Sequence, residues 1–171
     1  MASVTEYKII FAGDGGVGKS TFIHRYKTAI FNSWYVPTLG VDVEVIALYT
    51  NYGMFVLNIW DTAGQEKYGG LKEAYFIGAH GAIVMFDTTS KGTYDNVDFW
   101  VNGIKNTAGD IPIDIYGNKC DSRSMVVREN ARFNLLSCKS NYNFFKPLND
   151  LLRKITGHDD LNVVFSYDHQ L

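Results

Sequence analysis

Short apolar runs, separated by glycines or polar turns, recur along the chain and predict the strands of a sheet. Glu6–Ala12 is an apolar run that ends in a cluster of glycines, and it predicts a buried strand that leads into a tight loop. Val41–Tyr49 alternates between apolar and polar residues, as a half-buried strand does. Asn51–Gly53 is typical of a hairpin turn, so we expect Met54–Trp60 to pair with Val41–Tyr49 as an antiparallel strand.

The later part of the chain alternates between strand and helix patterns. Ala82–Phe86 and Ile111–Tyr116 predict two more buried strands, and apolar residues recur at helical spacing from Tyr94 to Ile104 between them. A second helical pattern runs from Phe145 to Ile155, and Gly157 stands where that helix would end. This alternation predicts an α/β domain with a mainly parallel sheet. Ligands of such sheets bind at the carboxyl ends of the strands, so candidate chemistry is expected in the loops there.

The composition is that of an ordinary folded domain. A chain of 171 residues is about the size of one domain and needs no disulfide or metal to stabilise its core. Sixteen Lys and Arg residues against eighteen Asp and Glu residues give a formal charge of −2, which disfavours a surface built to bind nucleic acid. The two cysteines, Cys120 and Cys138, are too few for the disulfide framework of a secreted domain.

The sequence carries no recognisable targeting or membrane segment. Its first residues lack the basic and apolar regions of a signal peptide, and no apolar run is long enough to cross a bilayer. The last residues, Asp168–Leu171, include no cysteine that could carry a prenyl group. We therefore expect residues 1–171 to form a single intracellular domain that is monomeric, binds no nucleic acid and has no membrane anchor.

The first motif is a phosphate loop. Gly13–Ser20 reads GDGGVGKS, which matches the pattern G-x-x-x-x-G-K-[S/T] directly after the first predicted strand. Glycines let consecutive main-chain N–H groups converge on an anion, and a helix beginning near Gly18 adds its dipole. Lys19 would neutralise the β- and γ-phosphates, and the Ser20 hydroxyl would ligate Mg²⁺. The residues expected at the phosphates are Asp14, Gly15, Gly16, Val17, Gly18, Lys19, Ser20 and Thr21.

A second motif follows the strand Met54–Trp60. Asp61 stands at the carboxyl end of that strand, where a carboxylate can hold the Mg²⁺ shell through water. Gly64 can approach a γ-phosphate through its N–H, and Gln65 can orient an attacking water. Thr38 lies in a polar and aromatic loop upstream and can close over Mg²⁺ when a γ-phosphate is present.

Two further loops fit the recognition of guanine. Asn118–Asp121 reads NKCD and follows the strand Ile111–Tyr116. Asp121 could accept hydrogen bonds from guanine N1–H and the exocyclic amine, which adenine does not offer in that arrangement, while the Lys119 stem covers the base. A later loop could present main-chain N–H groups to guanine O6, and its residues are Ser137, Cys138 and Lys139.

In chain order, GDGGVGKS, the Thr38 loop, WDTAGQ, NKCD and SCK resemble the small GTPases of the Ras superfamily, from about Tyr7 to Gly157. Within it, the stretches YVPTLGVDVEV, WDTAGQEKYGGLKEAYFI and KSNYNFFKP most resemble the Ran family of nuclear-transport GTPases. The resemblance implies a P-loop GTPase fold with a six-stranded, mostly parallel sheet, one antiparallel edge strand and about five flanking helices. It also implies that Phe31 lies against guanine and that Tyr35 packs near the catalytic glutamine.

The same resemblance implies a GTP/GDP switch that uses Mg²⁺ and works in the nucleus and cytoplasm. Its expected partners are an exchange factor, a GTPase-activating protein and receptors of the importin and exportin kind. Gln65, Lys19 and Tyr35 are the expected catalytic residues. No Arg or Lys occurs between Ala29 and Leu39, so we expect slow hydrolysis without an activating protein.

The chain departs from the Ran pattern in three places. It ends at Leu171, without the C-terminal helix and acidic tail of Ran-like proteins. Only residues 122–136 separate Asp121 from Ser137, and Val126–Glu129 stands where a basic helical segment is expected. Pro37 and Cys138 replace residues that are usually alanine, and we expect the latter change to be tolerated because that loop works through its main chain.

Three other functions are compatible with parts of this pattern. A phosphate-loop kinase or ATPase shares the first motif, but the placement of Asp121 favours guanine over adenine. A nucleotide-locked scaffold that never hydrolyses GTP would share every binding motif. A small GTPase of vesicle traffic or cytoskeletal signalling would share the hydrolytic residues as well.

Overall fold

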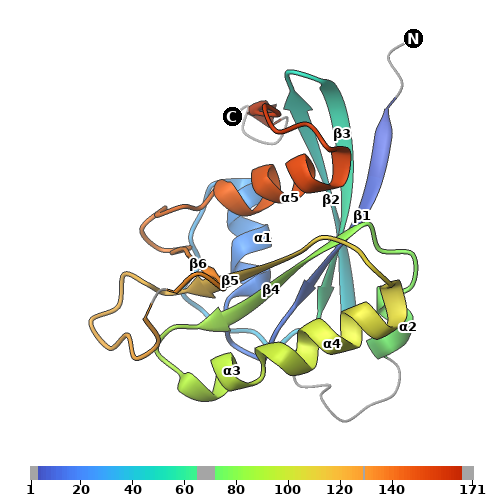
Figure 1. The fold of residues 1–171 in the computed structure, drawn as a ribbon. Helices are drawn as coiled ribbons and strands as arrows, with labels where there is room; N and C mark the ends of the chain where they lie inside the picture. Colours follow the sequence, from blue (N-terminus) through green and yellow to red (C-terminus); the bar gives the residue numbers. More distant parts are fainter. Residues whose placement is uncertain (1–3, 65–71, 129, 167–171) are drawn as a thin grey trace.

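The computed structural model of the protein describes residues 4–64, 72–128 and 130–166. Within these residues, seven strands form one sheet in the order β6-β5-β4-β1-β3-β2-β7, and helices cover both of its faces (Figure 1). The strands are β1 (Thr5–Ala12), β2 (Val41–Thr50), β3 (Gly53–Thr62), β4 (Gly81–Asp87), β5 (Ile113–Asn118), β6 (Asn134–Leu135) and β7 (Val163–Ser166). The helices are α1 (Lys19–Thr28), α2 (Lys72–Phe76), α3 (Lys91–Asp95), α4 (Val97–Ala108) and α5 (Lys146–Thr156).

The strand pairing confirms the predicted fold class and corrects the sheet edge. β1 pairs in parallel with β3 and β4, β4 with β5, and β5 with β6, while β2 and β3 form the predicted antiparallel hairpin. Among the described residues, the sheet has seven strands where six were expected, because β7 pairs antiparallel with the end of β2 and takes the place of β2 at the edge. β7 has only four residues, and a run that short carries too little alternation to be recognised in the sequence.

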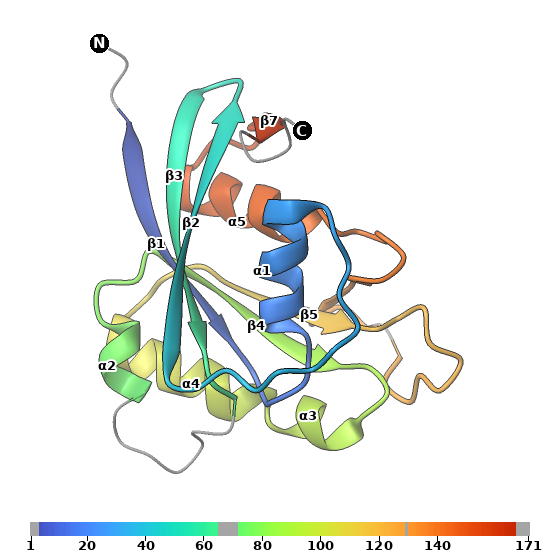
Figure 2. The same ribbon diagram turned by 180° about the vertical axis from the view of Figure 1, so that it is seen from behind.

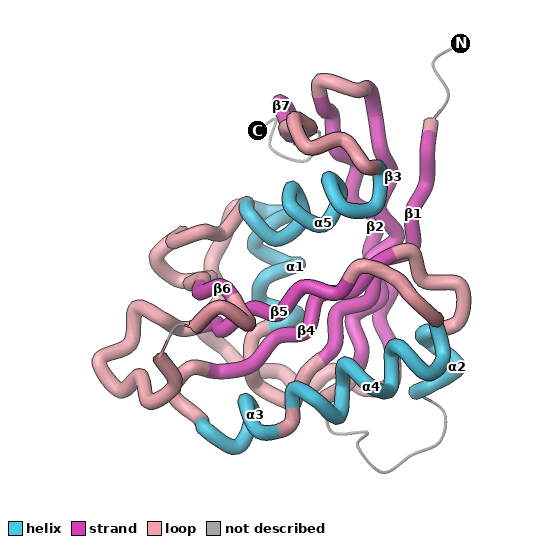
Figure 3. Tube along the Cα trace, viewed as in Figure 1, coloured by secondary structure: helices cyan, strands magenta, loops and turns pink. Residues whose placement is uncertain are grey.

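Each face of the sheet has its own apolar core. Figure 3 shows the helices that lie over the two faces, α1 and α5 on one side and α2 and α4 on the other. On one face, α1 and α5 pack over the central strands, with Phe22, Leu148 and Leu151 fully buried among them. On the other face, α4 contributes Trp100 and Ile104 to a core beneath α2 and α4. Burial of side chains this large on both faces supplies most of the hydrophobic stabilisation of such a three-layer domain.

The helix predicted from Tyr94 to Ile104 is divided into two pieces. α3 ends at Asp95, Asn96 forms the junction, and α4 continues as an amphipathic helix to Ala108. Apolar spacing reports the buried face but does not report such a break in the main chain. The end of α5 agrees with the prediction, since Gly157 takes a left-handed φ of 73° and donates its N–H to the carbonyl of Arg153 over 2.8 Å.

The loops at the carboxyl ends of the strands surround one end of the sheet. Figure 2 shows the connection between α1 and β2 running across these strand ends. Residues 122–128 and 130–133 form turns beside β5, and the N–H groups of Val126 and Val127 both donate to the carbonyl of Thr88, over 2.8 and 3.0 Å. In the described ranges, none of the helices has the length and apolar character needed to cross a bilayer.

Candidate nucleotide-binding site

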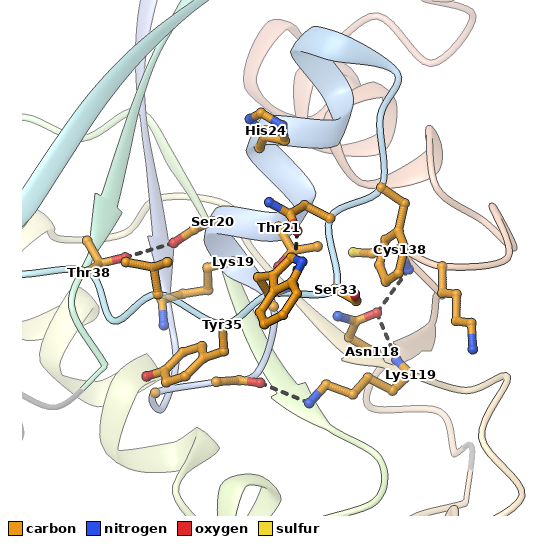
Figure 4. A pocket seen from close by; sticks show the side chains of 18 of the residues that line it. Lys19, Ser20, Thr21, His24, Ser33, Tyr35, Thr38, Asn118, Lys119 and Cys138 are labelled. Carbon is orange, nitrogen blue, oxygen red and sulfur yellow. Dashed lines mark hydrogen bonds between the residues drawn. The ribbon is translucent and has the colours of Figure 1, made fainter.

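A cavity of about 430 Å³ opens where the carboxyl ends of the strands meet α1 and the α1–β2 connection (Figure 4). This volume lies in the range of small-molecule sites. The predicted site residues on its wall are Gly15, Gly16, Gly18, Lys19, Ser20, Thr21, Phe31, Tyr35, Thr38, Gly64, Asn118, Lys119, Asp121, Cys138 and Lys139. The structure thus brings four separated motifs to one cavity.

Four of the predicted site residues do not line the cavity and lie behind its wall. Val17 and Ser137 are fully buried, and Asp61 is 4% exposed beneath the hydroxyls of the phosphate loop. Asp14 directs its carboxylate to Asn96 and Trp100 rather than into the cavity, so its side chain is not a nucleotide ligand in this geometry. Gln65 lies outside the described residues.

Lys19 is positioned by the loop that precedes it. Its side chain is only 5% exposed, and its Nζ donates to the carbonyls of Gly13 over 2.8 Å and Asp14 over 3.0 Å. Burial lowers the pKa of Lys19 to about 8, although the carboxylates of Asp61 and Asp14 partly oppose this effect. An anion bound in front of the amine would favour its charged form and offset the cost of burial.

Three oxygen-bearing side chains from three segments meet beside Lys19. Ser20 Oγ lies 2.8 Å from Thr38 Oγ1 and also donates a short hydrogen bond to Asp61 Oδ2. The second carboxylate oxygen of Asp61, Oδ1, is buried and has no hydrogen-bond partner among the described residues. Burial raises the pKa of Asp61, so a cation nearby would relieve the cost of its charge.

This donor set fits a magnesium ion. Mg²⁺ prefers oxygen ligands and is usually held by one or two protein groups together with phosphate oxygens and water. The hydroxyls of Ser20 and Thr38 are the residues that would ligate it, with Asp61 behind them to hold its water shell. The unpartnered Oδ1 of Asp61 is the observation that favours a cation at this place.

The loop after β3 packs directly onto the phosphate loop. A Cβ at Gly64 would lie 2.1 Å from the N atom of Gly15 and 2.2 Å from the carbonyl carbon of Asp14, so only glycine fits this approach. Tyr35 is 59% exposed and extends toward Gly16 from the α1–β2 connection, as Figure 4 shows. The two segments that would respond to a γ-phosphate therefore both touch the same loop.

Asn118 joins the base loops to the phosphate loop. Its Nδ2 donates to the carbonyl of Val17 over 2.9 Å, and its Oδ1 accepts the N–H groups of Lys119 and Cys138 over 2.7 and 3.1 Å. A Cβ at Gly18 would lie 2.2 Å from Asn118 Nδ2, which explains why glycine stands there. One amide thus sets the relative positions of three loops.

Lys119 spans the cavity from the base loop to the phosphate loop. The main chain of Lys119 takes a left-handed φ of 65°. The Lys119 Nζ donates to the carbonyl of Gly16 over 2.9 Å and to Asp87 Oδ2 over 2.5 Å. The aliphatic stem is thereby held extended along one wall. A flat base could pack against that stem, as the sequence predicted.

Asp121 and the Ser137 loop are in direct contact at the base end of the cavity. Ser137 Oγ donates to Asp121 Oδ1 over 2.6 Å and also accepts the N–H of Ser140 over 2.9 Å. Because one carboxylate oxygen is tied to Ser137, the plane of the carboxylate is fixed for whatever it binds. Cys138 is 2% exposed, and burial raises the pKa of its thiol to about 12, so the thiol is a packed, neutral group.

Arg25 supports the residue expected against guanine. Its guanidinium lies 5.7 Å from the centroid of the Phe31 ring and 5.3 Å from that of Phe144, and its Nη1 donates to the carbonyl of Lys139 over 2.9 Å. These contacts connect α1 to both segments that flank the base end of the cavity. The sequence offered no spacing signal for Arg25, because its partners come from distant parts of the chain.

Several wall residues were not predicted from the sequence. They are His24, Asn32, Ser33, Trp34, Val36 and Ser122. Trp34 is 83% exposed and stands next to Tyr35, so two adjacent aromatic residues border the cavity. A tryptophan is uncommon in a loop. Its presence there was the signal in the sequence that could have drawn attention to Trp34.

A comparison with protein families matches residues 8–156 to the Ras family. The match includes the phosphate loop, the loop after β3 and both base loops, and it covers most of the chain. Members of this family are small GTPase switches that bind GDP and GTP, typically with Mg²⁺, and are controlled by exchange factors and GTPase-activating proteins. From its fold, its cavity and this match, the chain belongs to the Ras family.

Proposed function

We propose that the protein hydrolyses GTP as a conformational switch of the Ran kind. The observation that carries the hydrolytic part is the meeting of Ser20, Thr38 and Asp61 beside Lys19. Thr38 belongs to the α1–β2 connection and Asp61 to the end of β3, so a bound triphosphate would gather both segments around the phosphate loop. Ser20 and Thr38 would hold a magnesium ion here, and its positive charge would offset the negative charge that develops on the phosphates.

The residues of the chain have separate roles in this proposal. Lys19 and the main-chain amides of the phosphate loop neutralise the charge that develops on the transferred phosphoryl group. In this proposal the Gly64 N–H approaches the γ-phosphate, and the packing of Gly64 against Gly15 of the phosphate loop supports this role. Gln65 orients the attacking water, and Tyr35 closes over the site from the side of Gly16.

Guanine selectivity is assigned to Asp121. Its carboxylate accepts a hydrogen bond from Ser137 over 2.6 Å and borders the cavity, where an adenine would offer it no further donor. Competition of GDP and ADP against fluorescently labelled GDP tests the assignment. We expect GDP to compete at least 10³-fold better, and equal competition would refute a guanine site.

The unaided rate of hydrolysis is expected to be slow. The α1–β2 connection from Ala29 to Leu39 holds no Arg or Lys that could stabilise the transition state in cis. A partner protein would then accelerate the reaction on the order of 10³–10⁵-fold. Single-turnover assays on the isolated protein measure this directly, and several turnovers per second would overturn the expectation. Complete absence of turnover with every activating extract would instead favour a nucleotide-locked scaffold.

The Ran-like role rests on the resemblance of the sequence stretches around Tyr35, after Asp61 and around Tyr142. It assigns the protein to nucleocytoplasmic transport, present in nucleus and cytoplasm, with importin- and exportin-like receptors that bind the GTP form. A pull-down with GTP-loaded Gln65→Leu protein, set against the GDP-loaded wild type, tests it. Recovery of importin-like proteins only with the GTP form would support the role, whereas recovery of vesicle or cytoskeletal effectors would contradict it.

A further inference from the structure

Asp14 stands in the phosphate loop, yet its carboxylate faces the start of α4. Oδ2 accepts a hydrogen bond from Asn96 Nδ2 over 2.6 Å, and Oδ1 accepts one from Trp100 Nε1 over 2.9 Å. Asn96 forms the junction between α3 and α4, and Trp100 is 1% exposed. A buried indole N–H needs an acceptor, and both oxygens of Asp14 are engaged by this one helix start.

The peptide that joins Asp14 to Gly15 is a meeting point of the site. Its carbonyl accepts the Lys19 amine over 3.0 Å. The backbone of Gly64 packs against it so closely that a Cβ would lie 2.6 Å from the Asp14 carbonyl oxygen. The position of this one peptide therefore affects the amine and the glycine expected at the β- and γ-phosphates.

We propose that Asp14 is a positioning residue that anchors the phosphate loop to the α3–α4 junction, and that this anchor determines how long the nucleotide stays bound. The proposal rests on the nucleotide-binding function proposed above. The negative carboxylate also lies at the amino-terminal end of α4, where the helix dipole favours it. Loss of either hydrogen bond releases the loop from the helix and weakens the arrangement of Lys19 around the phosphates.

The polarity of the Asp14–Asn96 pair allows a test by exchange. In Asp14→Ala, no acceptor remains, so the Asn96 amide and the Trp100 N–H both lose their partner. In the double variant Asp14→Asn with Asn96→Asp, the amide donates to the new carboxylate, and both hydrogen bonds return with the net charge unchanged. Asn96→Asp alone places two carboxylates face to face.

The measurement is the release rate of fluorescently labelled GDP after addition of excess unlabelled GDP, with Mg²⁺ present. We expect Asp14→Ala and Asn96→Asp each to release GDP about 10-fold faster than the wild type. The double variant should return to within about twofold of the wild-type rate. Asp98→Asn serves as the matched control, because Asp98 also lies in the first turn of α4 but is exposed and pairs with Arg132.

The outcomes separate the two proposals. A wild type that retains no labelled GDP refutes the nucleotide-binding function itself. A wild type that retains GDP with an unchanged Asp14→Ala rate refutes the anchor, and so does a double variant that releases GDP as fast as Asn96→Asp. Thermal unfolding identifies variants that do not fold, and Trp100→Phe, which keeps an aromatic ring in the core but lacks the indole N–H, then provides the second test with the same expected acceleration.

Discussion

The side-chain amide of Asn118 donates to the main-chain carbonyl of Val17 over 2.9 Å. β5 ends at Asn118, and Val17 lies in the phosphate loop behind the cavity wall, so a single hydrogen bond joins the base loop to the phosphate loop. The oxygen of the same amide holds the N–H of Cys138 over 3.1 Å. The base end and the phosphate end of the cavity are therefore mechanically connected through a buried residue.

Substitution of Asn118 by Ala should weaken both the fold and nucleotide binding. It leaves the Val17 carbonyl and the Cys138 N–H buried without their partner, so we expect the free energy of unfolding to fall by about 2–3 kcal/mol. Labelled GDP should also be released at least 10-fold faster. Denaturant unfolding and nucleotide release measure the two effects, with Asn102→Ala on the exposed face of α4 as the control. Unchanged release would show that the amide does not set the loop positions.

Substitution of Ser137 by Ala should impair base selectivity more than phosphate binding. Ser137 is fully buried and fixes Asp121 by a hydrogen bond of 2.6 Å, so its loss lets the carboxylate rotate. We expect the affinity for GDP to fall about 10-fold while the weak affinity for ADP stays the same. Competition binding of both nucleotides gives the ratio, and Ser140→Ala, at an exposed position in the same loop, is the control. An equal loss for both nucleotides would contradict the assigned role.

Substitution of Gly64 by Ala should separate GDP binding from GTP hydrolysis. The added Cβ would lie 2.1 Å from the N atom of Gly15, which is main chain and cannot move aside cheaply. The loop after β3 would then be held away from the phosphate loop, so we expect single-turnover hydrolysis to slow at least 10-fold with GDP retention nearly unchanged. Gly92→Ala is the control, because a Cβ there meets nothing within 4 Å. Wild-type hydrolysis by Gly64→Ala would show that this packing is not needed.

Nucleotide binding should take up protons at alkaline pH. Burial holds the pKa of Lys19 at about 8 against an ordinary value of 10.5, and the phosphates of GDP favour the charged amine. Binding therefore draws a proton between pH 8 and 10.5, and the affinity for GDP should decrease as the pH rises through that window. Calorimetry at pH 8.5 in two buffers of different ionisation enthalpy measures the uptake. The uptake should be smaller at pH 7.5, where more of the free Lys19 amine is already charged.

The same shift has a consequence for the nucleotide-free protein. The unfolded chain binds more protons than the folded chain between pH 8 and 10.5, because Lys19 regains its ordinary pKa on unfolding. The contribution of Lys19 to the free energy of unfolding therefore rises with pH across that window, and it is lost as the pH falls through 8. Lys19→Met should remove this part of the pH dependence in thermal unfolding. If the stability of Lys19→Met still rose with pH in this window, another titrating group would be responsible for the pH dependence.

Local sequence determined the strands, the loops after them and the types of residue that those loops carry. The phosphate loop needs glycines at φ values of 75° and 105°, and Gly16 and Gly18 supply them wherever the chain places that loop. Alternation in Val41–Tyr49 and the turn at Asn51–Gly53 were enough to predict the β2–β3 hairpin, because register and turn are set by neighbouring residues. Gln65 remains a prediction from the sequence.

Only the tertiary structure decided which side chains meet. Asp14 belongs to the phosphate motif, but its carboxylate binds Asn96 and Trp100, more than eighty positions later in the chain. The pairing of β7 with β2 and the support of Phe31 by Arg25 arise in the same way. Apolar periodicity and motifs report what each segment does with its neighbours in sequence. Hydrogen bonds between distant segments depend on the packing of the whole sheet and its helices, which no local pattern encodes.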